Sequence, residues 1–274
     1  TDSGSAVGNL VQPISIQSAL ACTRYLADVS PPSITSFTLD NAHDLLTIKF
    51  SEPVRGSSFN PSLLTFLASA GSSNLVGLSG GVFSSQDGVL ELSVAISRAD
   101  TILLKTNLRL GKTTSNTFLS SALGTVVDMA GNPSVPLLSA SPLQAGSVIR
   151  DSIPPELTAF DLNLNDHTTT LYFSDVVSVS TLVVSSLTFQ ETKSDATASY
   201  TLTNSGSASS DGYTVIINLT KVDSDRLKAI TNLAVSENST YVSCFASLIK
   251  DPLGQRVISI IPNAALQVTY FTED

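Results

Sequence analysis

The feature that most constrains this chain is an internal repeat with a period of 123 residues. The segment PPSITSFTLD, which begins at Pro31, recurs as PPELTAFDLN from Pro154. The same offset relates Phe50-Ser51-Glu52 to Phe173-Ser174-Asp175. Further matches in this register are Leu64-Thr65-Phe66 with Leu187-Thr188-Phe189, Asp128 with Asp251, and Leu143-Gln144 with Leu266-Gln267. Self-similarity at a fixed offset indicates that each period is one structural unit.

The repeat divides the 274 residues into three parts. Residues 29–151 and 152–274 are two full units, each of the usual size of a domain. Residues 1–28 are in phase with the last part of each unit, so we expect them to be the closing strands of a preceding repeat. Because unpaired strands expose backbone groups, we expect this segment to be an ordered strand that pairs with chain outside the two full units.

The hydrophobic pattern within a unit is typical of β-strands. Leu46, Ile48 and Phe50 alternate with polar residues, as do the apolar residues of segment 90–96. One short helix per unit is expected, at about 99–106 and 223–230, each with an Asp near its start as N-cap. The sequence therefore predicts an all-β fold of tandem Ig-like Greek-key β-sandwiches with one short helix per repeat.

Composition and charge exclude several classes of function. The net charge of −9 argues against proteins that bind nucleic acid or anionic lipid, because both need a basic face. Only 14% of residues are charged, whereas 44 Ser and 28 Thr make up about a quarter of the chain, so hydroxyl groups supply much of the polar surface. No run of about 18 apolar residues is present to span a membrane. Residues 1–6 lack the features of a signal peptide, so an extracellular protein needs a signal upstream of Thr1.

The Pro-Pro pairs at the start of each unit are expected to be short, stiff linkers, because proline fixes its own φ and extends the residue before it. At this point the chain resembles a known family. The run from Pro31 through FTLD, the phrase Ile48-Lys-Phe-Ser-Glu-Pro-Val54 and the phrase Val127-Asp-Met-Ala-Gly-Asn132 look like bacterial-type Ig-like repeats. These repeats occur in surface-layer proteins, large secreted adhesins and repeat-rich extracellular glycoproteins (mastigoneme-like). The resemblance implies a sandwich fold and a spacer or adhesive role.

The sequence carries little catalytic material, so we expect no enzyme and no resident cofactor. The chain has two histidines, His43 and His167, each beside an Asp in a predicted turn, where a solvated residue is the usual reading. No nucleotide-binding fingerprint or nucleophile elbow is present. For metals, Glu52, Asp128 and Asp151 are oxygen donors that would suit calcium if they converged near a domain junction. The competing interpretation is that Asp128 caps its own turn and Glu52 is a surface charge.

Two further residue types bear on the environment of the protein. Cys22 and Cys244 are the only cysteines and occupy different phases of the repeat, so either a bridge between them or two unbridged thiols is open. Asn218-Leu-Thr220 and Asn238-Ser-Thr240 match the N-glycosylation acceptor pattern, and we expect both asparagines to face solvent.

These observations favour a non-enzymatic structural repeat unit of an extracellular glycoprotein filament, appendage or cell-surface rod. Its expected partners are copies of itself, neighbouring repeats in a polymer, or other cell-surface glycoproteins. The alternative is an adhesin or carbohydrate-binding module on a cell surface. Sugar sites usually present exposed aromatic rings, and this chain has no Trp and six Tyr, which favours the first interpretation.

Overall fold

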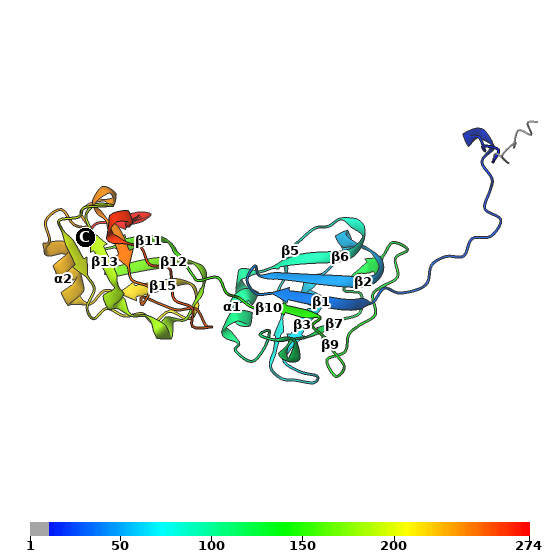
Figure 1. The fold of residues 1–274 in the computed structure, drawn as a ribbon, viewed down its shortest axis with the longest axis horizontal. Coiled ribbons are helices and arrows are strands. Elements are labelled where there is room, and N and C mark those ends of the chain that lie inside the picture. Colours follow the sequence, from blue (N-terminus) through cyan, green and yellow to red (C-terminus); the bar gives the residue numbers. More distant parts are fainter. Residues whose placement is uncertain (1–10) are drawn as a thin grey trace, which may run out of the picture.

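The computed structural model describes residues 11–274, among which two β-sandwiches are arranged in line (Figure 1). Buried apolar side chains form two separate clusters, one within residues 34–145 and the other within residues 157–268. Phe37 packs near Phe66 in the first cluster, with ring centroids 6.1 Å apart, and Phe160 packs near Phe189 in the second at 6.0 Å. The predicted fold class, all-β sandwiches with one short helix each, is confirmed.

The first sandwich has two sheets. One contains, in spatial order, β10 (Ser147–Ile149), β1 (Ile34–Asp40), β2 (Leu45–Arg55), β6 (Asp87–Ile96) and β5 (Gly81–Phe83), with β8 (Val127–Asp128) also paired to β2. The other contains β4 (Leu75–Gly77), β3 (Leu64–Leu67), β7 (Phe118–Ser121) and β9 (Leu143–Gln144).

The second sandwich has the corresponding two sheets. One contains, in spatial order, β15 (Gly212–Asn218), β12 (Thr168–Val177), β11 (Leu157–Asn163) and β18 (Tyr270–Thr272). The other contains β14 (Ser199–Thr201), β13 (Leu187–Gln190), β16 (Tyr241–Cys244) and β17 (Leu266–Gln267). Single-turn 3-10 helices lie at Ile16–Ser18, Gly56–Ser58, Pro61–Leu63, Thr114–Asn116, Val179–Thr181, Val184–Ser186, Glu237–Ser239 and Pro262–Ala264.

Strand pairing keeps the phase of the sequence repeat. Phe37 lies opposite Ile48 in the first sandwich, and Phe160 lies opposite Leu171, 123 positions later, in the second. In both sandwiches the first strand also pairs in parallel with the last strand, through β1 with β10 and β11 with β18. The alternating apolar residues therefore face the same way in both units, because one register sets which side chains face the core.

Each sandwich has one α-helix: α1 (Arg98–Thr106) follows β6, and α2 (Lys221–Ala229) follows the equivalent strand β15. The expected Asp N-caps are wrong: Ser97 and Thr220 are the caps, and their hydroxyl oxygens accept the backbone N–H of Asp100 and Asp223. Each Asp lies in the first helical turn, and its carboxylate instead accepts hydrogen bonds from a neighbouring loop. Neither helix in the described part of the chain is long and apolar enough to cross a bilayer.

The segment before the first sandwich extends away from both domains (Figure 1). Between residue 11 and β1 it contains the 3-10 turn Ile16–Ser18 and no strand, and Ile16 and Leu20 are 93% and 81% exposed. The expected strand is therefore not formed in residues 11–28, because a strand needs a neighbouring strand to satisfy its backbone groups. Residues 1–10, to which the same expectation applied, lie outside the described residues. Pairing of this segment with another chain stays a prediction.

Candidate functional site: a lysine joint and an acidic cluster

The two sandwiches meet at a buried lysine. Lys105 lies near the end of α1 in the first sandwich, and its side chain is 7% exposed. Its Nζ lies 2.7 Å from Asp175 Oδ1 and 2.9 Å from Asp151 Oδ2, and 3.3 Å from Asp44 Oδ1. Asp175 belongs to β12 of the second sandwich, Asp151 to the linker, and Asp44 to the β1–β2 turn. We call these four residues the lysine joint; it links three parts of the chain through one ammonium group.

Burial shapes the ionisation of the lysine joint. Burial lowers the pKa of Lys105, but hydrogen bonds from its ammonium to Asp175 and Asp151 outweigh this effect and raise the pKa above its usual value. Burial raises the pKa of Asp175 to about 6 despite the opposing effect of Lys105, and burial also raises the pKa of Asp44. The Lys105 ammonium therefore contacts three carboxylates, and two of them, those of Asp175 and Asp44, have raised pKa values.

A second contact across the joint involves Tyr213 at the start of β15. The guanidinium carbon of Arg98, on α1, lies 4.6 Å from the centroid of the Tyr213 ring. The Tyr213 hydroxyl lies 3.4 Å from Asp44 Oδ2, and burial together with the charge of Asp44 raises its pKa to about 12. This stacked cation adds an attraction between the first helix and the second sandwich.

The linker itself is tied to the second sandwich. Asp151 Oδ1 accepts the backbone N–H of Ile153 at 3.0 Å, and Gln255 Nε2 lies 3.4 Å from the carbonyl oxygen of Asp151. The Asp251 carboxylate in turn accepts two hydrogen bonds from Gln255, from its backbone N–H at 2.7 Å and from its Nε2 at 2.8 Å. The second proline of the pair, Pro155, is buried, and its carbonyl oxygen accepts the N–H of Ile258 at 2.9 Å. The linker is thus fixed on both sides of its prolines.

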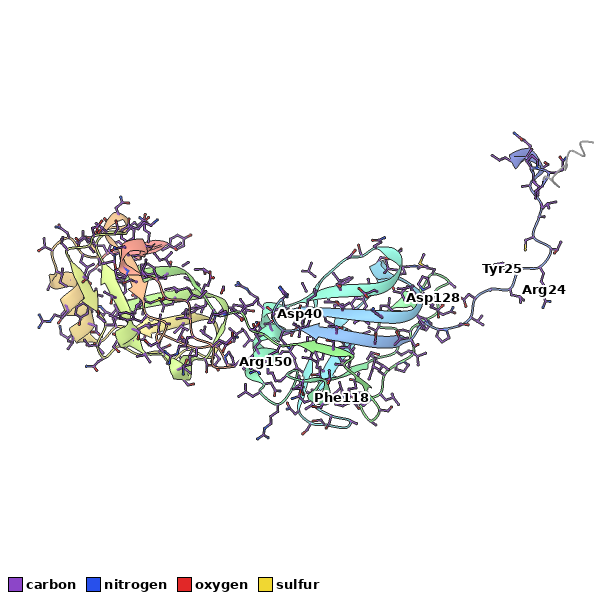
Figure 2. All side chains as sticks on the ribbon, in the orientation of Figure 1. Arg24, Tyr25, Asp40, Phe118, Asp128 and Arg150 are labelled. Atoms are coloured by element: carbon purple, nitrogen blue, oxygen red, sulfur yellow. The ribbon has the colours of Figure 1, made fainter. Side chains whose placement is uncertain are left out.

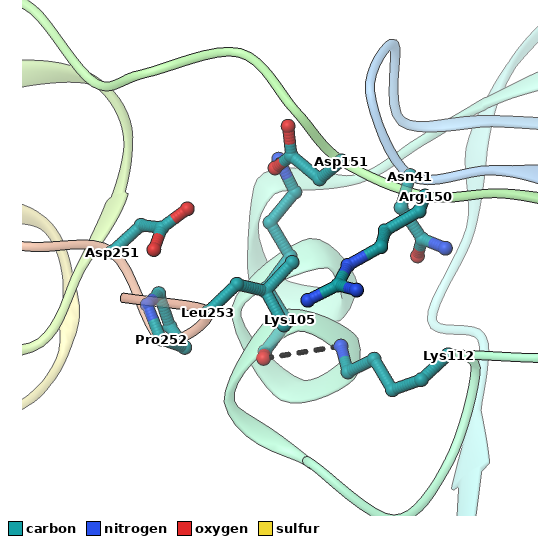
Figure 3. A pocket seen from close by; sticks show the side chains of 8 residues that line it. All are labelled: Asn41, Lys105, Lys112, Arg150, Asp151, Asp251, Pro252 and Leu253. Carbon is teal, nitrogen blue, oxygen red and sulfur yellow. Dashed lines mark hydrogen bonds and ion pairs between the residues drawn. The ribbon is translucent and has the colours of Figure 1, made fainter. Parts of the chain in front are cut away.

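A small pocket opens beside the lysine joint. Figure 3 shows its lining residues: Asn41, Lys105, Lys112, Arg150, Asp151, Asp251, Pro252 and Leu253. Lys112 Nζ donates to the carbonyl oxygens of Leu104 at 2.9 Å and Lys105 at 3.2 Å, which satisfies the last turn of α1. Burial and the charge of Lys105 lower the pKa of Lys112 to about 8. The loop 251–253 of the second sandwich therefore lies next to the C-terminal end of α1, whose carbonyl oxygens already accept hydrogen bonds from Lys112 of the first sandwich.

A related group of carboxylates lies at the opposite end of the first sandwich, where the chain enters it. Figure 2 labels Asp128 there, next to the leading segment, and Asp40 and Arg150 at the far end. One oxygen each from Asp28, Glu52 and Asp128 lie within 4.8 Å of one another; we call these residues the acidic cluster. Burial and the charges of Asp28 and Asp128 raise the pKa of Glu52. The fold therefore holds the three carboxylates close together although their negative charges repel one another.

The acidic cluster is fixed by its own turn. Asp128 Oδ1 accepts the N–H groups of Gly131 at 2.6 Å and Asn132 at 2.8 Å, and Asp128 Oδ2 accepts Asn132 Nδ2 at 2.7 Å. Although burial opposes it, these bonds hold the pKa of Asp128 below its usual value. Asn132 Nδ2 also donates to the carbonyl oxygen of Asp28 at 3.2 Å. Asp128 therefore caps its turn, as one of the two sequence interpretations held.

Of the three calcium candidates, the structure brings Glu52 and Asp128 together and places Asp151 elsewhere, in the lysine joint. The third member of the acidic cluster is Asp28, which the sequence analysis overlooked. Its phase was the available signal, because Asp28 stands 123 positions before Asp151. Lys105 was overlooked as well, since a lone lysine in a helix gives no local indication of a distant partner.

The remaining candidate residues are placed as follows. Asn218, on β15, and Asn238, in a 3-10 turn, are both exposed. Cys22 and Cys244 are both unbridged; Cys22 is exposed, whereas Cys244 lies in the second core, where burial raises its pKa. The two histidines make different contacts, His43 Nδ1 with Asp40 Oδ2 and His167 Nδ1 with Ser224 Oγ, each at 2.9 Å.

Comparison with known proteins gives only distant similarities. No protein-family model matches the chain, and no curated protein does. Among solved structures it is similar to the crystal structure of the S-layer protein SbsC, with 14% identity over 89% of this chain and 26% of that one, at a TM-score of 0.30. It is also similar to the N-terminal part of this bacterial S-layer protein, with 15% identity over 89% of this chain and 44% of that one, at the same TM-score. The chain spans less than half the length of these S-layer chains, and a TM-score of 0.30 is too low to indicate function.

Proposed function

We propose that this chain is a structural repeat unit of an extracellular glycoprotein filament, appendage or cell-surface rod. The observation that carries the proposal is the lysine joint, in which Lys105 of one sandwich is buried among Asp44, Asp151 and Asp175. Sandwiches that served only as separate binding modules would not need a buried ion network between them. In a rod such a network would add stiffness, because stiffness depends on resistance to bending at each joint.

The joint resists bending for an electrostatic reason. Moving the second sandwich away would separate Asp175 from the Lys105 ammonium and break the 2.7 Å contact between Nζ and Oδ1, which is strengthened by its partly water-excluded position. The linker adds to this resistance, because Pro155 is anchored to Ile258 and leaves little freely rotating chain between the sandwiches. The proposed mechanism is therefore mechanical, with each sandwich burying its own core and each joint limiting rotation.

The proposed units are residues 29–151 and 152–274, and the proposed partners are further copies or neighbouring repeats. Lateral association at the surface would rest on uncharged polar groups, because only 14% of residues are charged. Hydroxyl groups of Ser and Thr are available there for hydrogen bonds and for glycans.

The test is electron microscopy of the native material with gold-labelled antibodies raised against the second sandwich. We expect label on fibres or rods outside the cell, with the same label lost after the antibody is absorbed with the purified chain. Label confined to the cell interior, or native protein that is dispersed and unassembled, contradicts the proposal. Tight binding to a glycan array by unassembled protein would favour the adhesin instead.

A further inference from the structure

The acidic cluster and the lysine joint are built from the same positions of the repeat. Asp28, Glu52 and Asp128 stand 123 positions before Asp151, Asp175 and Asp251 respectively. In the second set, the first two carboxylates hold the ammonium of Lys105 at 2.9 Å and 2.7 Å. In the first set, no lysine or arginine of residues 11–274 forms an ion pair with the carboxylates.

The frames that hold these carboxylates also match bond by bond. Ser30 N–H donates to Asp28 Oδ1 at 3.0 Å, as Ile153 N–H donates to Asp151 Oδ1 at 3.0 Å. The carbonyl oxygen of Pro32 accepts the N–H of Val135 at 2.9 Å, and that of Pro155 accepts the N–H of Ile258 at 2.9 Å. The side-chain amides that hold the carbonyl oxygens of Asp28 and Asp151 belong to Asn132 and Gln255, also equivalent positions. The acidic cluster is therefore shaped like an occupied lysine joint.

The far end of the second sandwich carries the matching half. Lys228 on α2 stands 123 positions after Lys105, and its Nζ lies 2.8 Å from Oδ2 of Asp274, which is equivalent to Asp151. The side chain of Lys228 is 25% exposed, compared with 7% for Lys105. Lys228 thus has one carboxylate partner in place and lacks the equivalents of Asp175 and Asp44; the latter position is His167.

We propose that the acidic cluster is a docking site for the lysine-bearing helix end of a second copy of this chain. Lys228 of one copy enters between Glu52 of the next copy and the carboxylate at the Asp28 position, which is Asp28 of the next copy or, in a continuous chain, Asp274 of the first. This rests on the proposed function, and it names the partner and the contact. Charge complementarity supports it, because an ammonium would relieve the repulsion that raises the pKa of Glu52.

Calcium is the competing occupant of the acidic cluster, and the geometry disfavours it. Calcium takes six to eight oxygen ligands. Both oxygens of Asp128 already accept hydrogen bonds from Gly131 and Asn132, so few lone pairs remain to face a cation. The equivalent set in the second sandwich takes an ammonium instead.

The docking contact is testable with a head-to-tail fusion in which residue 29 of a second copy follows Asp274 of the first, so that Asp274 takes the place of Asp28. Tethering raises the effective concentration to about millimolar, which suits a contact of this size. A carbodiimide joins an amine to a carboxylate in direct contact, and mass spectrometry locates the link. We expect a link between Lys228 and Glu52, which lie at opposite ends of one copy, and its loss in a Glu52→Gln fusion. The proposal is overturned if Lys228 is linked only to Asp274. It is also overturned if the acidic cluster binds calcium and no link forms between Lys228 and Glu52.

A second measurement does not depend on cross-linking. Small-angle scattering should show an extended four-sandwich rod for the fusion. Glu52→Lys in the second copy should give a shorter and broader distance distribution. Adding Lys228→Glu in the first copy should restore the extended distribution. If the three proteins give indistinguishable scattering profiles, the proposed contact between Lys228 and Glu52 is refuted. The Lys105 joint inside each copy is unaffected by these changes, so a stiff Lys105 joint beside a loose Lys228 joint would refute this inference and leave the proposed function standing.

Discussion

The two sandwiches use the same buried aspartate in the first turn of their helices, but to different extents. In the first, the Asp100 carboxylate accepts the N–H and the hydroxyl of Ser79, at 2.9 and 3.0 Å. In the second, Asp223 accepts six hydrogen bonds from the loop residues Tyr200, Thr203, Asn204 and Ser205. The repeat therefore conserves a helix with a buried acid, while each unit closes its own loop around that acid.

The largest expected effect comes from the matched core phenylalanines. Phe66→Ala and Phe189→Ala should each destabilise their own sandwich by about 3–5 kcal/mol, because each removes a fully buried ring and leaves a cavity. Urea unfolding followed by hydrogen exchange, read separately for residues 34–145 and 157–268, measures this. A loss of protection spread equally over both regions from one substitution would show that the cores are not independent.

The buried aspartates should differ in energy. Asp223→Asn places an amide N–H₂ group against the N–H and O–H donors of the loop. We therefore expect the free energy of unfolding to fall by about 3 kcal/mol, compared with about 1 kcal/mol for Asp100→Asn. Although burial opposes it, hydrogen bonds from Ser205 and Thr203 hold the pKa of Asp223 well below its usual range. Its stabilising contribution is therefore present in full above the usual value of 3.8 and is lost progressively as the pH falls from there through the low pKa. Denaturation curves of the two variants provide the comparison; equal losses would contradict it.

The two equivalent lysines should also differ. Lys105→Met leaves buried carboxylates without a cation, so we expect the sandwiches to separate, with the docked population falling by about a hundredfold, equivalent to about 3 kcal/mol. The unfolding free energy of each sandwich should change by less than about 1 kcal/mol, because separation hydrates the carboxylates. Lys228→Met is the matched control and should change nothing in the single chain. NMR relaxation distinguishes joint from independent tumbling, and unchanged joint tumbling of Lys105→Met would refute the role of this lysine.

The lysine joint should tighten in mild acid. The pKa of Asp175, about 6 in the docked state, lies above the usual value of 3.8, so its contribution is fully present below about pH 4 and is lost as the pH rises through 6. The raised pKa of Asp44 acts in the same direction. We expect docking to strengthen about tenfold between pH 7.5 and pH 5, measured by scattering or relaxation, and Asp175→Asn to flatten this dependence. Docking that weakens in acid would contradict the assignment.

The smallest expected effect concerns glycans, which should be confined to the second sandwich. Acceptor patterns occur at Asn218 and Asn238, whereas residues 29–151 contain none. After secretion from a eukaryotic cell, we expect intact-mass measurement to show two glycans, one lost in each of Asn218→Gln and Asn238→Gln. Because both side chains are exposed, each substitution should change stability by less than about 0.5 kcal/mol. Unmodified protein from such a cell contradicts the prediction.

Much of the fold was predictable because its signals are local. Alternation over 46–50 predicted a half-buried strand, and the 123-residue offset carried each strand into the second unit. The N-caps were mispredicted because Ser97 and Thr220 compete with the nearby Asp residues, and only the path of the Ser79 and Ser205 loops shows where the carboxylates are used. The segment 11–28 kept the phase of the closing strands without becoming one, because its local pattern had no partner strand.

By itself, the amino-acid sequence determined the repeat, its phase, the strand-rich fold class and the equivalence of Asp28 with Asp151. The tertiary structure alone decided that Lys105 reaches Asp175, 70 positions away, and that Glu52 and Asp128 meet Asp28 rather than Asp151. The physical reason is range. Periodicity and turn chemistry act over a few residues and are visible in any short window, whereas an ion pair depends on the whole path of the chain between its two partners.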